Sequence, residues 1–187
     1  VITDISFKAE KGETVAIIGS TGSGKSTLIN LIPRFYDATE GSVKVDGVDV
    51  RKMTQKDVRD RIGYVPQKGV LFSGTIDSNI RYGKPEITDA QVKEAAEVAQ
   101  ATEFIDTKPE RYKTPIAQGG SNVSGGQKQR LSIARAIAKD PEIFIFDDSF
   151  SALDFKTDSQ LRKALKEYTK DATTVIVAQR ISTILGA

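Results

Sequence analysis

Short apolar stretches at the start of the chain alternate with polar residues and predict β-strands. Residues 1–7 and 14–18 follow this alternating pattern, and a turn at Lys11-Gly12 separates them. Residues 42–50 carry Asp46-Gly47 between two further short runs, and this dipeptide is typical of a two-residue β-hairpin. We therefore expect the strands of this first part to be antiparallel, at least in part.

The segment after residue 18 has a different pattern. A glycine-rich turn follows the apolar run, and residues 25–32 then carry apolar positions at helical spacing up to Pro33, which ends or bends a helix. The order strand, glycine loop, helix is typical of the opening of a phosphate-binding α/β unit.

The middle of the chain is mostly helical in pattern. Capping-box sequences begin at Thr88 and Ser124, and apolar residues follow each of them at helical spacing. We therefore expect a helical subdomain over about residues 68–138. It would be inserted into a sheet core formed by residues 1–67 and 139–187.

An α/β pattern returns near the end of the chain. Residues 143–146 form a continuous apolar run, as expected for a strand buried on both faces of a parallel sheet, and residues 173–177 predict another. Thr157 is expected to cap the helix between them. The fold class is thus α/β, with a mixed sheet whose N-terminal part is antiparallel. Both ends fall inside patterned segments, so we expect one domain, residues 1–187, cut from a longer polypeptide.

Composition limits the chemistry. The chain has 187 residues, of which 39% are hydrophobic, enough for the core of one domain. With 27 basic and 25 acidic residues, the net charge of +2 gives no electrostatic case for nucleic-acid binding by the whole surface. The absence of Cys and His excludes disulfides, thiolate nucleophiles and imidazole catalysis. Catalysis must therefore use carboxylates, amides, hydroxyls, Lys, Arg, backbone N–H groups or a hard cation.

A phosphate-loop pattern, G-x-x-x-x-G-K-[ST], follows the second predicted strand. It comprises Gly19, Ser20, Thr21, Gly22, Ser23, Gly24, Lys25, Ser26 and Thr27. Glycines allow backbone N–H groups to turn toward phosphate oxygens. Lys25 supplies a positive charge for the β- and γ-phosphates, and the Ser26 hydroxyl can ligate Mg²⁺. The alternative is a glycine-rich turn that merely precedes a helix.

Two further motifs have both a structural and a functional interpretation. Asp147 directly follows the apolar run 143–146. An acidic residue there is either an ordinary strand-to-loop exit or a carboxylate that holds Mg²⁺, and the phosphate-loop pattern favours the second interpretation. Ser124-Gly125-Gly126-Gln127 is either a well-capped helix or a second anion-binding helix terminus. A second phosphate-directed site is useful if it faces a nucleotide held by another subunit.

These motifs together resemble the ATP-binding cassette (ABC) family over essentially all of the chain. Residues 19–27 resemble Walker A, residues 143–147 resemble Walker B, and residues 123–127 resemble the signature motif. Gln67 matches the Q-loop glutamine, which in the family touches Mg²⁺ and the attacking water. The D-loop matches Ser151, Ala152, Leu153 and Asp154. The resemblance implies a P-loop NTPase core and two cassettes packed head to tail, with ATP between each Walker A and the opposite signature.

Within this family, residues 71–76 and 79–83 resemble exporter cassettes, where this segment receives coupling helices of the membrane domain. The alternative is that Leu71, Phe72 and Ile76 merely fill the core of the helical subdomain. The resemblance implies an ATP-hydrolysing motor domain at the cytoplasmic face of the cell membrane. Its transmembrane domain would belong to the same polypeptide, and no nucleic acid would be bound. A soluble ABC ATPase of DNA repair or translation is the alternative.

Two positions depart from the family pattern. Asp148 stands where the family usually has a catalytic Glu, so its carboxylate ends one methylene, about 1.5 Å, further back. Gln179 replaces the switch His and cannot carry charge or relay a proton. Because the signature is intact, the chain resembles the degenerate-site subunit of a heterodimeric multidrug or lipid exporter, whose partner supplies Glu and His. The alternative is a nucleotide-holding regulatory module with negligible hydrolysis.

Overall fold

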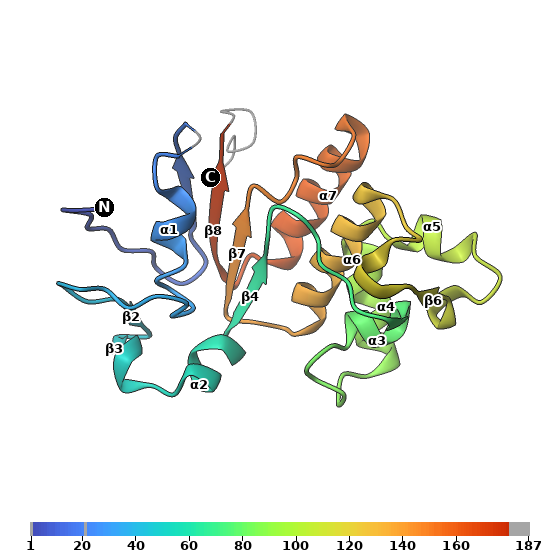
Figure 1. Ribbon diagram of the computed structural model, residues 1–187, viewed down its shortest axis with the longest axis horizontal. Helices are drawn as coiled ribbons and strands as arrows, with labels where there is room; N and C mark the ends of the chain where they lie inside the picture. The colour runs from blue at the N-terminus through green and yellow to red at the C-terminus, as the bar shows by residue number, and fades with distance from the viewer. Residues whose placement is uncertain (1, 21, 180–187) are drawn as a thin grey trace. The chain divides into compact units, whose positions relative to one another are not determined.

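The chain folds into two compact units, and the computed structural model describes residues 2–20 and 22–179 (Figure 1). The first unit falls within residues 1–64, 141–147 and 171–187, and the second falls within residues 65–140 and 148–170. The second unit therefore contains the segment after Asp147 as well as the expected helical subdomain. The functional division at residues 68 and 138 stays a prediction, and Thr21 lies outside the described residues.

A four-stranded sheet forms the centre of the first unit (Figure 1). Its order is β1 (Thr14–Ile18), β8 (Thr173–Ala178), β7 (Ile143–Asp147) and β4 (Ile62–Val65). Both β1 and β7 pair with β8 in parallel. The two continuous apolar runs thus become neighbouring inner strands, as their pattern predicted.

The prediction of a strand over residues 1–7 is wrong for the described part, because residues 2–10 form no strand. β1 pairs with β8, which is distant in sequence, and among the described residues no strand pairs with residues 2–7. Ile5 and Phe7 are each 52% exposed, so their alternation does not build a buried face. An alternating pattern specifies a strand only where a neighbouring strand completes its hydrogen bonds.

The predicted hairpin around Asp46-Gly47 is confirmed. β2 (Lys44–Val45) and β3 (Val48–Asp49) pair antiparallel, and the two turn residues have φ of 51° and 76°. Positive φ at both turn positions is the geometry that Asp-Gly favours. The hairpin forms a sheet of its own, so the antiparallel part does not continue the central sheet.

Two short helices pack near this sheet within the first unit. α1 (Lys25–Ile29) ends earlier than the expected residue 32, because the next residues turn more tightly before Pro33. α2 (Gln55–Asp60) follows a 3₁₀ turn at Val50–Lys52 and is capped by Thr54. The buried cluster that joins the elements contains Ile29, Val45, Val50, Val58, Ile62, Ile145, Val175 and Val177.

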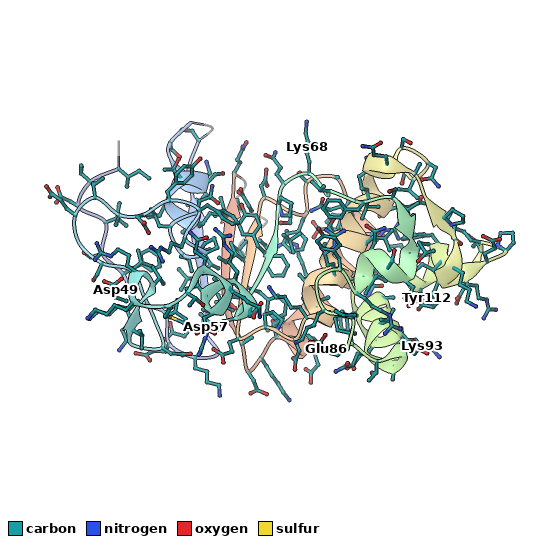
Figure 2. All side chains as sticks on the ribbon, turned by 60° about the horizontal axis from the view of Figure 1, so that its bottom comes forward. Asp49, Asp57, Lys68, Glu86, Lys93 and Tyr112 are labelled. Atoms are coloured by element: carbon teal, nitrogen blue, oxygen red, sulfur yellow. The ribbon has the colours of Figure 1, made fainter. Side chains whose placement is uncertain are left out.

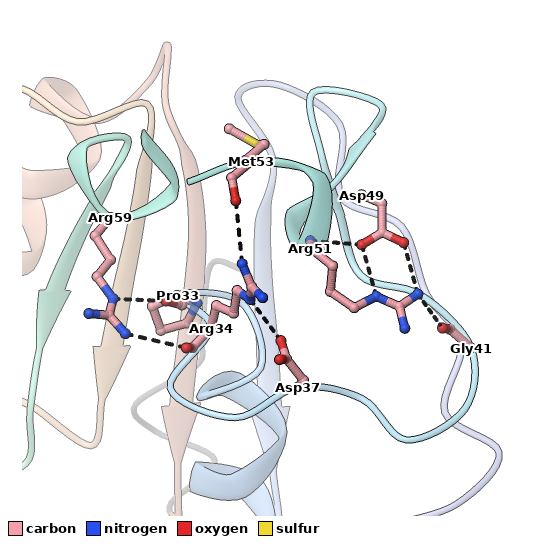
Figure 3. Close-up of polar contacts among 8 residues, drawn as sticks. All are labelled: Pro33, Arg34, Asp37, Gly41, Asp49, Arg51, Met53 and Arg59. Atoms are coloured by element: carbon pink, nitrogen blue, oxygen red, sulfur yellow. Dashed lines mark hydrogen bonds and ion pairs between the residues drawn. The ribbon is translucent and has the colours of Figure 1, made fainter. Parts of the chain in front are cut away.

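Arginine side chains hold the loop that follows α1 (Figure 3). Arg59 of α2 donates to the carbonyls of Pro33 and Arg34, at 3.2 and 3.3 Å. Arg34 in turn pairs with Asp37 at 2.8 Å and donates to the carbonyl of Met53 at 3.3 Å. Charge-assisted bonds of this kind fix a segment that has no regular structure of its own.

The second unit is built around α6 (Gly125–Ala138), which packs against α3 (Ile76–Ile80) and α4 (Asp89–Val98) (Figure 1). It also contains α5 (Thr102–Asp106), α7 (Phe155–Tyr168), β5 (Gly74–Thr75), β6 (Pro115–Ile116) and 3₁₀ turns at Arg111–Lys113 and Gln118–Gly120. α4 packs on α5 and α7, and β5 pairs antiparallel with β6. Most of α6 after its second turn is buried, so it is the central helix of this unit.

Capping confirms two of the predicted helix starts and corrects a third. Thr88 and Ser124 form reciprocal capping boxes at α4 and α6. Thr157 is not an N-cap, however. Asp154 caps α7 instead, since its carboxylate accepts from the backbone N–H of Thr157 at 2.8 Å and from its hydroxyl at 2.9 Å. The helix thus begins at Phe155, three residues earlier than the position after the expected cap.

Candidate nucleotide-binding and catalytic site

Three of the predicted site segments end at one edge of the central sheet. The register places Ile18 beside Ala178 and Asp147 beside Val177. Because these strands are parallel, the predicted phosphate loop, Asp147 and Gln179 all lie at the carboxyl ends of neighbouring strands. In open α/β sheets this edge is where ligands bind.

The phosphate loop is closed by its own lysine. Lys25 Nζ donates to the carbonyls of Gly19 and Ser20 at 2.6 Å each and lies 3.3 Å from Ser23 Oγ. Gly24, at the start of α1, has φ of 95°, a conformation that favours glycine. These bonds place the Lys25 ammonium group at the start of α1, where its positive charge can meet a phosphate.

Ser26 and Asp147, two of the three predicted Mg²⁺ ligands, lie together. Ser26 Oγ lies 3.2 and 3.1 Å from the two carboxylate oxygens of Asp147. Mg²⁺ prefers such oxygen donors and usually completes its shell with phosphates and waters. Among the residues that the structure describes, no group of three or more His, Cys, Asp or Glu could hold a metal. The Ser26 hydroxyl and the Asp147 carboxylate are oxygen donors of the kind that Mg²⁺ binds together with a phosphate.

Tyr64 is a site residue that the sequence reasoning missed. Its hydroxyl lies 3.2 Å from Asn30 Oδ1 and 3.3 Å from Asp147 Oδ2, and it can donate to either. Burial, followed by the Asp147 carboxylate, raises the pKa of the Tyr64 phenol well above its usual range. The phenol therefore stays a donor and helps orient Asp147. A tyrosine on a strand whose other residues are buried was the available signal.

Two of the three predicted catalytic residues, Gln67 and Asp148, lie in contact within the second unit. Gln67 Nε2 donates to Asp148 Oδ2 at 3.3 Å. Asp148 itself has φ of 49°, which is unusual for a residue other than glycine. Gln67, the third predicted Mg²⁺ ligand, is exposed, as is the neighbouring Lys68, which extends from the segment after β4 (Figure 2).

The signature and D-loop segments approach each other within the same unit. Ser124 Oγ accepts from the Gln127 backbone N–H at 3.1 Å, and Ser124 and Gly125 are exposed at the start of α6. A Cβ added to Gly126 would lie 3.5 Å from the carbonyl oxygen of Ala152 in the D-loop. The Ser151 hydroxyl donates to the Asp148 carbonyl at 3.2 Å, and Leu153 is half-buried. D-loop and signature are therefore neighbours beside Asp148.

The exporter-like segment divides into core and surface. Leu71 and Ile76 are 1% and 0% exposed, so for them the core-filling alternative holds. Phe72 is 41% exposed and stacks on the exposed ring of Tyr82 with centroids 4.4 Å apart. The guanidinium of Arg135 lies over both rings. Phe72 is thus part of a surface aromatic pair and not a filler of the core.

A family model described as ABC transporter matches residues 2–151. The chain belongs to the ABC transporter family. It is 49% identical over all 187 residues to proteins named multidrug export ATP-binding/permease proteins in Staphylococcus aureus strains NCTC 8325 and COL. A solved structure titled as a bacterial Atm1-family ABC exporter with ATP bound is 40% identical, with a TM-score of 0.93 over 98% of this chain.

The chain spans 32% of the length of these relatives and of the matching exporter chain. It corresponds to the nucleotide-binding domain of the family, with the parallel α/β core expected from the phosphate loop. ABC transporter domains of this kind are ATPases, so the chain is an ATPase domain. None of the helices among the described residues has the length and apolar character needed to cross a membrane.

Proposed function

We propose that the chain is the ATP-driven motor domain of an ABC exporter. It would work at the cytoplasmic face of the cell membrane, with a transmembrane domain in the same polypeptide. Support comes from relatives that are named export ATP-binding/permease proteins and match the whole chain at 49% identity. The structural observation that carries the proposal is the meeting of Lys25, Ser26 and Asp147 at one sheet edge.

In this proposal, residues 19–27 bind the ATP phosphates. Lys25 exchanges its two carbonyl partners for phosphate oxygens, which are stronger acceptors for an ammonium group. Ser26 and Asp147 would hold Mg²⁺, and Gln67 is the third proposed ligand. When bound, the ion neutralises phosphate charge. Tyr64 keeps the Asp147 carboxylate oriented through its hydrogen bond.

We further propose that hydrolysis at this chain's own site is slow. Asp148 is the base position, and its carboxylate is one methylene shorter than the usual Glu. A displacement of about 1 Å can lower a rate about a hundredfold. Gln179 can donate a hydrogen bond, but its amide carries no charge. Gln67 also donates a hydrogen bond to the Asp148 carboxylate, and this bond must break before the carboxylate can accept a proton from water at that oxygen.

We propose a second role for the chain, because its signature motif is intact. Ser124, Gly125, Gly126 and Gln127 would close over the ATP of a partner cassette, while the partner's signature closes over residues 19–27. The exposure of Ser124 and Gly125 leaves this helix start accessible to such a partner. A homodimer would carry Asp148 and Gln179 at both sites, so a heterodimer with Glu and His in the partner is the proposed assembly.

The decisive experiment compares full-length transporter assembled from the wild-type chain with a double variant, Asp148→Glu with Gln179→His. We expect ATP turnover by this chain without its partner to rise at least tenfold in the double variant. The matched single variants separate the two positions. Fast turnover of the wild-type chain without a partner would overturn the slow-site proposal and leave the motor-domain proposal intact.

A nucleotide-holding regulatory module is the second candidate, and the shortened base at Asp148 favours it for this site. The two functions differ in the fate of bound ATP. Radiolabelled ATP that stays intact at this site through many turnovers of the partner's site indicates the holding module. ATP that is hydrolysed at each cycle indicates the motor.

A further inference from the structure

A buried glutamine on α6 joins two loops of the second unit. Gln129 is 1% exposed, and its Nε2 donates to the carbonyl of Ser149 at 2.7 Å and to that of Pro66 at 3.1 Å. A primary amide has two N–H donors, so both are used. A buried amide is tolerated when such bonds are made and costly when they are lost. Hydrogen bonds to these two carbonyls therefore explain why a polar side chain can be buried on the central helix.

The two carbonyls belong to the immediate neighbours of the proposed catalytic residues. Pro66 precedes Gln67, and Ser149 follows Asp148. Ser149 is 0% exposed, and its hydroxyl donates to the carbonyl of Val65 at 2.6 Å. Three hydrogen bonds thus join the backbone on either side of the Gln67–Asp148 contact.

Steric fit holds the same loop on the same helix. A Cβ added to Gly69 would lie 2.8 Å from both the carbonyl oxygen of Lys128 and Ser132 Oγ, on either side of Gln129 along α6. The backbone at residue 69 therefore lies directly against α6, independently of the hydrogen bonds of Gln129. Contact at two points fixes the direction as well as the distance of residues 66–69.

We propose that Gln129 is a positioning residue for ATP hydrolysis, whose buried amide holds the carbonyls of Pro66 and Ser149 and thereby keeps Gln67 beside Asp148. The inference rests on the proposed ATPase function of this site and names a residue outside its nucleotide contacts. α6 begins directly after Ser124, so one helix carries both the signature and this clamp.

Amide hydrogen exchange of the full-length protein without nucleotide tests the clamp directly. Gln129→Met has a similar length but no donors, and it leaves both carbonyls unpaired. We expect exchange at residues 67–69 and 148–151 to become about tenfold faster, as the loss of a buried hydrogen bond implies. Gln129→Asn keeps the amide on a shorter side chain that reaches one carbonyl at most, so its effect should be intermediate. If the methionine variant does not fold, the asparagine variant is used for the test instead.

Leu131→Ala is the matched control. Leu131 is fully buried on α6 but lies two residues away, on the opposite side of the helix. It should lower thermal stability at least as much as Gln129→Met while leaving exchange at residues 67–69 and 148–151 unchanged. Equal exchange rates in wild type and Gln129→Met, or the same acceleration in Leu131→Ala, would overturn the proposal.

Kinetics provide a second readout, measured in the Asp148→Glu, Gln179→His background so that turnover is fast enough. A positioning role predicts that Gln129→Met lowers kcat about tenfold and changes KM for ATP less than twofold. A raised KM with unchanged kcat would contradict it. If this background hydrolyses no ATP, the proposed function fails, and the exchange experiment still decides the clamp.

Discussion

Lys25 is the residue on which nucleotide affinity depends most directly. Its ammonium group already lies within 2.6 Å of two loop carbonyls, so little rearrangement is needed to meet a phosphate. A hydrogen bond to a charged group contributes about 1.5–3 kcal/mol. We expect Lys25→Ala to weaken MgATP binding about 10- to 100-fold in isothermal titration. Lys44→Ala, which removes an exposed lysine of the same unit, should bind as wild type does.

Asp49 is expected to titrate well below other carboxylates. Arg51 donates to it from the guanidinium and from the backbone N–H, and these bonds lower the pKa of Asp49 from 3.8 to about 2 (Figure 3). The folded state therefore binds fewer protons than the unfolded state between these values. The stability that the Asp49 carboxylate contributes is therefore present above pH 3.8 and is lost as the pH falls through about 2.

A carboxyl NMR titration checks this pKa. In Arg51→Met, we expect the pKa of Asp49 to rise toward 3.8, though not fully, because the backbone N–H at position 51 remains. Arg61→Met removes an arginine that pairs with Asp46 and should leave Asp49 unchanged. An Asp49 pKa of 3.8 in the wild type would contradict the bonded geometry.

At the scale of elements, the docking of the loop after β4 on α6 depends on a glycine. Gly69→Ala places a Cβ 2.8 Å from the Lys128 carbonyl oxygen, so backbone must move. Overpacking of this kind costs about 1–3 kcal/mol. Urea unfolding should therefore show a lower midpoint.

Gly125→Ala is the control for this prediction. Gly125 is the first residue of α6, and an added Cβ meets nothing within 4 Å. Alanine is the better helix former, so this variant should be no less stable than wild type. Equal midpoints for the Gly69 and Gly125 variants would show that the loop is not held against α6.

At the scale of the whole molecule, the crossed arrangement predicts where a defect appears. Ser124→Ala should slow hydrolysis at the partner's site while leaving ATP affinity at Lys25 unchanged, because the signature closes over the partner's nucleotide. It also removes an N-cap, which costs about 1 kcal/mol. Site-resolved ATP hydrolysis in the assembled transporter is the measurement.

Thr88→Ala controls for the lost cap. Thr88 forms an equivalent capping box on α4, so the variant should lose similar stability without slowing the partner's site. An equal loss of activity in both variants would attribute the Ser124 effect to stability. Equal losses at both ATP sites in Ser124→Ala would contradict the crossed arrangement itself.

Local rules in the sequence predicted much of both units. The Asp46-Gly47 turn and the capping boxes at Thr88 and Ser124 depend on contacts within a few residues, so the sequence pattern alone specifies them. The buried runs at residues 143–146 and 173–177 predicted strands in the same way. Family membership followed from the order of these motifs.

Contacts between distant residues were decided only by the tertiary structure. The alternating segment 1–7 forms no strand in its described part, because strand pairing depends on residues that are distant in sequence. β1 pairs with β8 and not with this neighbouring segment. Tyr64 reaches Asp147 across 83 positions, and Gln129 reaches Pro66 across 63. A sequence pattern records which side chains are polar or apolar, but the partner of a buried polar group is set by how the backbone packs.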